Sequence, residues 1–224
     1  MRKIIIIIAV CAVAVPVFAQ TQTSVRAAAQ NVRGEIEQRQ AEFKEMVSAQ
    51  RAAAKSSIDA KRADLRKRLA TIRDERKKKL VEKIDAQMDA LNERRTDHFA
   101  NVLDRLEVIV GKIEERIAQA ETRGRDVSAA KSAIAEAKSA IAASRTAAVS
   151  QAGKTYAITV STEDALRVEV GKARKALYDD LASVRDAVKS AREAVHNAAV
   201  ALAQAVREEN RQATTTPTAA QNTQ

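Results

Sequence analysis

The chain has 224 residues, of which 30% are charged and 2% are aromatic, with five Gly, two Pro and no Trp. Large globular cores are built from big apolar and aromatic side chains, so this composition argues against an ordinary globular enzyme and favours long helices or coiled coils. The formal net charge of +10 favours anionic surfaces or polymers as partners, and the single cysteine, Cys11, excludes an internal disulfide.

Residues 1–19 have the pattern of a signal peptide. Arg2 and Lys3 precede an apolar run from Ile4 to Val15, Pro16 follows, and Ala19 ends a stretch of residues that signal peptidase accepts. The run is shorter than the ~20 residues that a membrane-spanning helix needs. We expect cleavage after Ala19 and export across the cytoplasmic membrane, with periplasm, cell surface and medium left open.

A very long helix is predicted next. Ser24 or Thr23 can serve as its N-cap, and no Pro occurs from there to Arg123. A continuous helix of this length would measure about 150 Å. Residues 20–98 are expected to form its charged arm. Whether it bends at Gly34 or Gly111 is left open.

One side of this helix carries an apolar residue at every eleventh position. Eleven residues make almost three helical turns, so such positions form a nearly straight row suited to packing against a partner helix. The predicted packing row is Val25, Ile36, Val47, Ile58, Leu69, Leu80, Leu91, Val102 and Ile113.

Basic residues accompany the apolar row and have two interpretations. They can belong to a solvent-exposed helix stabilised by pairs four residues apart such as Asp64 and Arg68, the interpretation we favour. They can also form an anion-binding face, whose candidate residues are Arg33, Lys44, Lys55, Arg62, Arg66, Arg73 and Lys77.

Residues 99–211 are predicted to form a three-helix coiled-coil region, because apolar residues recur at alternating steps of three and four. The hairpin turn is placed near Gly124, with Asp126 or Ser128 as the next cap, and a connector at 152–162. A third helix from Glu163 to Arg211 is nearly twice as long as the second, so its end is expected to overhang and favour self-association. Residues 212–224 are expected to be a disordered tail. The predicted fold is therefore all-α: a very long N-terminal helix, an antiparallel hairpin and a third long helix in an elongated three-helix coiled-coil bundle.

Motifs for chemistry are weak. Gly153-Lys154-Thr155 lacks the earlier glycine and the strand of a phosphate-binding loop, and neither His98 nor His196 has a second histidine one turn away. We predict no catalytic residue, cofactor or metal, and no specific nucleic-acid binding.

The leader, the charged helix and the turn at Gly124–Ser128 together resemble uncharacterised exported helical coiled-coil proteins of reduced-genome bacteria. The resemblance is clearest over residues 92–202 and implies architecture without an activity. The chain is more loosely similar in design to the Skp family of periplasmic chaperones, whose helical arms hold unfolded outer-membrane proteins. Their β-strands have no counterpart here outside Tyr156–Val160.

These features predict an exported, non-enzymatic structural or scaffolding protein that acts by helix–helix association, with itself or with another helical protein. Two alternatives remain: a module that binds an anionic envelope surface, lipid or acidic polymer, and a holdase-type periplasmic chaperone. A basic row beside an apolar row is shared by helices that lie on membranes.

Overall fold

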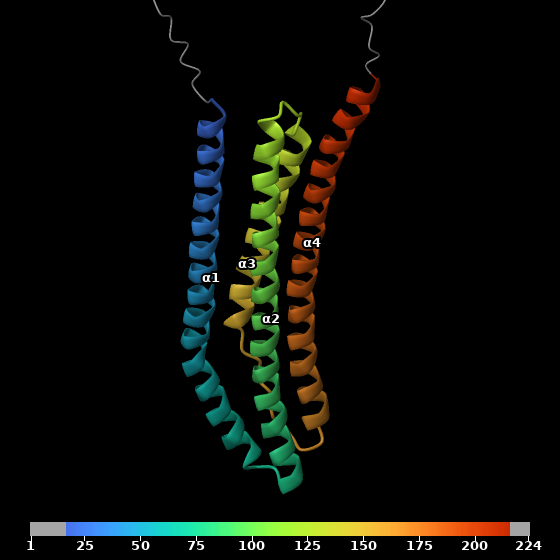
Figure 1. Ribbon diagram of the computed structural model, residues 1–224. Coiled ribbons are helices and arrows are strands. Elements are labelled where there is room, and N and C mark those ends of the chain that lie inside the picture. The colour runs from blue at the N-terminus through green and yellow to red at the C-terminus, as the bar shows by residue number, and fades with distance from the viewer. Residues whose placement is uncertain (1–16, 216–224) are drawn as a thin grey trace, which may run out of the picture.

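The computed structural model describes the backbone of residues 17–215 and the side chains of residues 30–208. Its four helices are α1 (Val17–Leu69), α2 (Glu75–Glu121), α3 (Ser128–Ala152) and α4 (Leu166–Thr215), and this described part contains no strand. The all-α prediction is confirmed at this level. The helices run alternately down and up, so the described chain begins and ends at one end of an elongated bundle (Figure 1).

The prediction of one continuous helix from Ser24 to Arg123 was wrong, because the chain reverses at residues 70–74. Ile72 in this turn is buried, which anchors the turn in the core. The carboxylate of Asp74 then accepts hydrogen bonds from the backbone N–H groups of Arg76 and Lys77 and caps α2. Because α2 runs back along α1, the predicted arm of residues 20–98 consists of two helices packed against each other, α1 and the first half of α2.

Gly34 and Gly111 do not interrupt the helices that contain them. The start of α1 also differs from the predicted N-cap at Ser24 or Thr23, since α1 begins at Val17, directly after Pro16. Residues 1–16 of the predicted leader lie outside the described residues, and so do residues 216–224 of the predicted tail. The predicted tail start was too early, because α4 extends to Thr215.

The helices are arranged with α2 and α3 in the middle. In the described structure α1 packs against α2 and α3, α4 packs against α2 and α3, and α1 and α4 do not touch. Figure 1 shows α1 and α4 on opposite sides of α2. The three helices expected to form a bundle are thus in mutual contact, and a fourth helix joins them.

The apolar positions predicted to face the interior of α2, α3 and α4 are buried. Leu202, the last of these positions on α4, is also buried. The expected overhang of α4 therefore leaves none of these positions exposed. The buried rows comprise Phe99, Leu103, Leu106, Val110, Ile113, Ile117 and Ala120 on α2; Ala130, Ile134, Ala137, Ile141, Ser144 and Ala148 on α3; and Leu166, Val170, Ala173, Leu177, Leu181, Val184, Val188, Ala191, Val195, Ala198 and Leu202 on α4.

The eleven-residue row holds along most of its described length. Ile36, Val47, Leu69 and Ile113 are buried, and Ile58, Leu91 and Val102 are half-buried. The side chain of Val25 is outside the described range. Leu80 departs from the row, with 57% of its surface exposed. Leu80 lies on nearly the same side of α2 as Leu91, because eleven residues make almost three turns. Its exposure follows from its place near the start of α2, where it lines an open pocket between α2 and α4.

The predicted hairpin turn is confirmed at Gly124, whose φ of 77° lies in the left-handed region that glycine tolerates. Asp126 accepts a hydrogen bond from the backbone N–H of Ser128 at 2.9 Å. Side-chain burial alternates along the connector after α3, as in an extended segment: Ile158 and Val160 are buried and Thr159 is exposed.

Candidate functional site

The predicted anion-binding residues mostly face carboxylates of the chain itself. Because α1 folds back on α2, Arg33 pairs with Glu115 and Arg66 with Glu82, at nitrogen–oxygen distances of 3.4 and 3.8 Å. Lys77 on α2 pairs at 2.6 Å with Glu163, which lies just before α4. Lys44 and Arg62 also pair with acids of α2. Lys55 is exposed on α1 and lines a small pocket beside α2, and Arg73 is exposed in the 70–74 turn. An external anion would have to compete with these internal partners at five of the seven positions.

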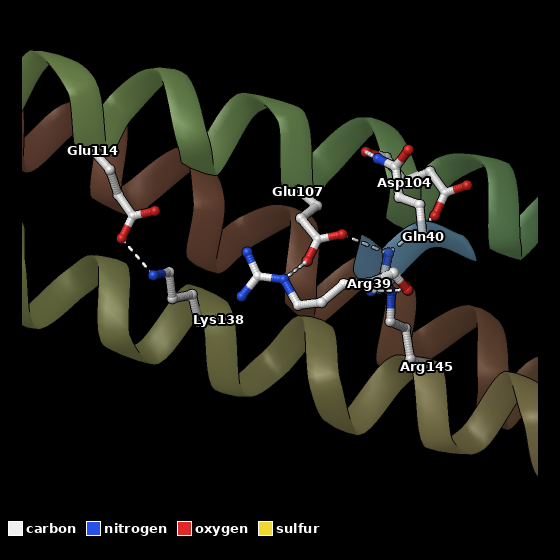
Figure 2. A network of polar contacts seen from close by, with 7 residues as sticks. All are labelled: Arg39, Gln40, Asp104, Glu107, Glu114, Lys138 and Arg145. Atoms are coloured by element: carbon white, nitrogen blue, oxygen red, sulfur yellow. Dashed lines mark hydrogen bonds and ion pairs between the residues drawn. The ribbon is translucent and has the colours of Figure 1, made fainter. Parts of the chain in front are cut away.

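A cluster of ion pairs lies where α1, α2 and α3 meet, and its Arg145 pairs are well buried. We call this cluster the α1 clasp: Arg39, Lys44, Asp104, Glu107 and Arg145. Arg145 donates to Asp104 at 3.0 Å and to Glu107 at 2.6 Å, while Arg39 pairs with the other oxygen of Glu107 at 3.0 Å. Figure 2 shows Arg39 and Arg145 converging on the acids of α2. The clasp thus ties α1 to both middle helices.

Arg145 is at the centre of the α1 clasp. Its side chain is only 11% exposed, and its guanidinium lies 4.8 Å from the ring centre of Phe43, a residue of α1 that is fully buried. The planar guanidinium can stack on an aromatic face while it donates to two carboxylates, which an ammonium group cannot do as well. Sequence reasoning missed Arg145, because it is one of three basic residues in an Ala-rich helix and the sequence does not indicate which of them faces acids of α2.

A second contact holds the lower part of α1 to α2. Arg62 donates to Asp89 at 2.6 Å and pairs with Asp85 at 3.4 Å. Burial raises the pKa of both carboxyls above 3.8, and the neighbouring Asp85 charge raises that of Asp89 further, although Arg62 acts in the opposite direction. Desolvation therefore opposes the charged form of both carboxyls, and the Arg62 guanidinium favours it.

Polar residues also join α2, the end of α3 and α4. Asn92 donates its side-chain amide to the carbonyl of Gln151 at 3.0 Å, and Gln151 donates to Asn92 and to the Tyr156 hydroxyl, both at 2.8 Å. Tyr156 in turn donates to Asp180 at 2.7 Å. Burial raises the pKa of the Tyr156 hydroxyl. For Asp180 burial acts upward, but hydrogen bonds from Lys154 and Tyr156 outweigh it and lower the pKa. This junction fixes the position of the connector.

An apolar groove runs between α2 and α4. Its larger part has a volume of about 550 Å³ and is lined by Lys77, Leu80, Val81, Ile84, Glu163, Asp164, Leu166, Arg167, Val170, Gly171 and Arg174. A smaller part adjoins it and shares Ile84 and Arg174, with Gln87, Met88, Leu91, Leu177 and Tyr178 as its other walls. We call the two parts together the α2–α4 groove.

The α2–α4 groove leaves apolar surface uncovered. Leu80 on the α2 wall and Tyr178 on the α4 wall are 57% and 51% exposed. Scattered exposed apolar residues are ordinary on a protein surface, but these two line one groove. The sequence predicted Leu80 to be a packing residue, and the structure places it on the wall of this groove.

The described residues contain no group of three or more His, Cys, Asp or Glu side chains placed to hold a metal ion. No described helix is apolar over a long enough stretch to cross a membrane. Comparison of the chain with protein-family models, curated proteins and solved structures finds no significant match. Any function assigned to the chain must therefore rest on its own surfaces: ion pairs on one side of α2 and an open apolar groove on the other.

Proposed function

We propose that this chain is an exported, non-enzymatic scaffolding protein that acts by helix–helix association, and that the α2–α4 groove is its association surface. The observation that carries this proposal is the exposure of Leu80, at 57%, on the wall of a groove whose other apolar lining residues include Val81, Ile84 and Val170. Burying such a side chain against a partner removes apolar surface from water, which favours association. The three–four spacing of the buried rows supports coiled-coil packing as the mode of helix contact.

The anion-binding alternative receives less support. Its candidate basic residues on α1 are paired largely with carboxylates of α2, which lowers the charge that α1 offers to a lipid or acidic polymer. The holdase alternative requires apolar surface for an unfolded client, and the α2–α4 groove is the surface that could supply it. A groove bounded by two helices fits a helical partner better than an irregular chain, because ridges of one helix fill the spaces between side chains of others.

A panel of synthetic helical peptides tests the proposed association. Each peptide carries Leu at helical spacing on one face, and the other face is uncharged, glutamate-rich or lysine-rich. We expect at least one peptide to bind the full chain, measured by fluorescence anisotropy, and binding to weaken in Leu80→Gln. The control is Ile109→Gln, since Ile109 is also exposed on α2 but outside the groove. If no peptide binds, or if both variants bind equally well, the proposed association surface is wrong.

Export is tested separately by sequencing the N-terminus of the protein isolated from its own cells. The leader pattern predicts that the mature chain starts at Gln20. A chain that still starts at Met1 would contradict export by cleavage after Ala19.

A further inference from the structure

We propose that the occupant of the α2–α4 groove is an amphipathic helix of another protein, with an apolar face and acidic flanks. This inference rests on the proposed function and adds the chemistry of the partner. It is supported by the length of the groove, by the absence of side-chain filling at Gly171, and by the charges along the two edges of the groove.

The groove has the dimensions of a short helix. On α2 it extends from Lys77 to Leu91, which is fourteen residues of rise and therefore about 21 Å. A partner helix of about four turns would cover this length. Because the two parts of the groove share Ile84 and Arg174, they form one continuous surface instead of two separate pockets.

Gly171 leaves the α4 wall open. A Cβ atom added there would meet nothing within 4 Å, although the residue lies inside a helix and lines the groove. Glycine in the middle of a helix costs about 1 kcal/mol relative to alanine. An open space at this position lets a partner helix approach the backbone of α4, as small residues do where helices come close together.

The charges along the edges of the groove favour an acidic partner. Arg167 and Arg174 line the α4 side, together with two acidic residues, Asp164 and the Glu163 that pairs with Lys77. On α2, helical spacing places three further basic residues on the edge next to Leu80 and Gln87. All five side chains are exposed, and none forms an ion pair or side-chain hydrogen bond with the described part of the chain: Arg76, Lys83, Arg94, Arg167 and Arg174.

The two sides of α2 differ in how their basic neighbours are paired. Where α1 covers α2, basic residues such as Arg39, Arg62 and Arg145 have carboxylate partners. Along the described α2–α4 groove the basic residues lack carboxylate partners, apart from Lys77, which pairs with Glu163. Carboxylates on the flanks of a docked helix would supply those partners, and such complementary charges steer association and select among partners.

Other occupants fit less well. Two copies of a chain with a net charge of +10 would bring like-charged edges together. The ends of the described chain, Val17 and Thr215, lie at the opposite end of the bundle from the groove (Figure 1). A free acyl chain is usually held in an enclosed cavity, whereas Leu80 leaves this groove open to solvent.

The test uses the full chain and the same three probe peptides. We expect the glutamate-flanked peptide to bind most tightly and the lysine-flanked peptide most weakly. Replacing both Arg167 and Arg174 by Gln should weaken binding of the glutamate-flanked peptide and leave the uncharged peptide unchanged. The matched control replaces Arg192 and Arg207, two exposed arginines of α4 outside the groove, by Gln.

Filling the groove provides a second variant. In Gly171→Phe the new ring occupies the open space on α4, so all peptides should bind about tenfold more weakly or worse, and the helical circular dichroism should be retained. Leu80→Gln should have an effect of similar size without adding volume.

Several results would overturn the inference. Equal or tighter binding of the lysine-flanked peptide would refute acidic flanks and leave the proposed helix association standing. Sedimentation showing a dimer that Leu80→Gln dissociates would make a second copy the occupant. Displacement of the bound peptide by dodecanoate, with no loss in the Arg167→Gln/Arg174→Gln variant, would point to an apolar small molecule. If no peptide binds, both the inference and the proposed function fail.

Discussion

Arg145 shows at the level of a single residue how the bundle holds α1. Its guanidinium reaches Asp104 and Glu107, which are about as buried as Arg145 itself. Removing charges from water is costly, so a buried ion pair adds little net stability compared with apolar residues of the same size. Removing only one partner of a buried ion pair lowers stability much more, because the remaining charges stay buried without their partner.

Arg145→Met is therefore expected to lower the free energy of unfolding by about 3 kcal/mol. Arg39 and Lys44 remain near the acids and prevent a larger loss. Urea denaturation followed by circular dichroism measures the change. As a control, Arg185→Met breaks the exposed pair with Asp186 and should cost about 0.5 kcal/mol or less. Equal effects of the two substitutions would show that the α1 clasp is not a buried cluster.

Asp89 gives a prediction about pH. Burial raises the pKa of this carboxyl above 3.8, so the folded chain holds the proton more tightly than the unfolded chain. Its contribution to the free energy of unfolding must then fall as pH rises through the interval from 3.8 to the raised value. The Asp89→Asn variant does not lose stability in this way as pH rises, because it has no carboxyl at position 89. The Arg62 side chain, which loses a charged partner in this variant, is 38% exposed and can be solvated by water.

Asp89→Asn should accordingly become more stable relative to the native chain as pH rises from about 4 to 7. Urea denaturation at several pH values measures the difference, and taking the difference removes the opposite contribution of groups such as Asp180, whose pKa is lowered. A variant that loses stability relative to the native chain over this interval would contradict the desolvation of Asp89.

At the scale of the helices, the interior faces of α2, α3 and α4 were predictable from the sequence because their apolar residues recur at three–four spacing. The reversal at residues 70–74 was missed because it contains neither Gly nor Pro. Its signals are local: Ile72 is buried in the core, and Asp74 caps the following helix. A cap residue within a helical pattern is only a weak signal of a chain reversal when the residues on both sides are good helix formers.

The α1-facing side of α2 explains why the site was only partly predicted. Its buried polar residues Asp85, Asn92, Thr96 and Glu107 recur at intervals of seven, four and eleven. Together with Gly111 they form a row at helical spacing beside the apolar one. Read alongside the basic row of α1, that polar row could have indicated an intramolecular partner. The α2–α4 groove could not be found in this way, because it depends on how two distant segments pack.

The 70–74 turn is expected to be sensitive to Ile72. Ile72→Ala should lower the free energy of unfolding by about 2–3 kcal/mol, because the turn loses its buried anchor. Asp74→Ala should cost about 1 kcal/mol through loss of the α2 cap. Thr71→Ala, an exposed change in the same turn, is the control. Thermal denaturation ranks the three, and a ranking with Thr71→Ala as the most destabilised would contradict the assignment of this turn.

Gly111 is expected to control the docking of α1 locally. A Cβ atom at this position would lie 2.6 Å from Cδ1 of Ile36, so Gly111→Leu forces α1 away, whereas Gly111→Ala requires only that the end of Ile36 rotate. Faster amide hydrogen exchange around Ile36 in Gly111→Leu would show the displacement. Gly34→Leu is a matched control, since its Cβ meets nothing within 4 Å. Equal exchange in both leucine variants would mean that α1 does not pack at Gly111.

At the scale of the whole molecule, the two sides of the middle helices have different roles. One side is covered by α1 and held by ion pairs, and the other carries α4 and the apolar groove. Acids of α2 pair with basic residues of α1 on the covered side, whereas Arg167 and Arg174 at the groove have no carboxylate partner among the described residues. This division depends on the reversal at 70–74, because a continuous helix would leave α2 without α1 beside it.

The separation of spin labels at positions 34 and 112, measured by double electron–electron resonance with Cys11 replaced by Ser, tests this reversal most directly. Arg33 pairs with Glu115 across the two helices, so labels at Gly34 and Lys112 should lie about 10–30 Å apart, as expected for neighbouring helices with axes about 10 Å apart. A continuous helix through both positions would separate them by about 117 Å. Absence of the short distance in the folded chain would contradict the docking of α1 and, with it, the division of surfaces on which the proposed function depends.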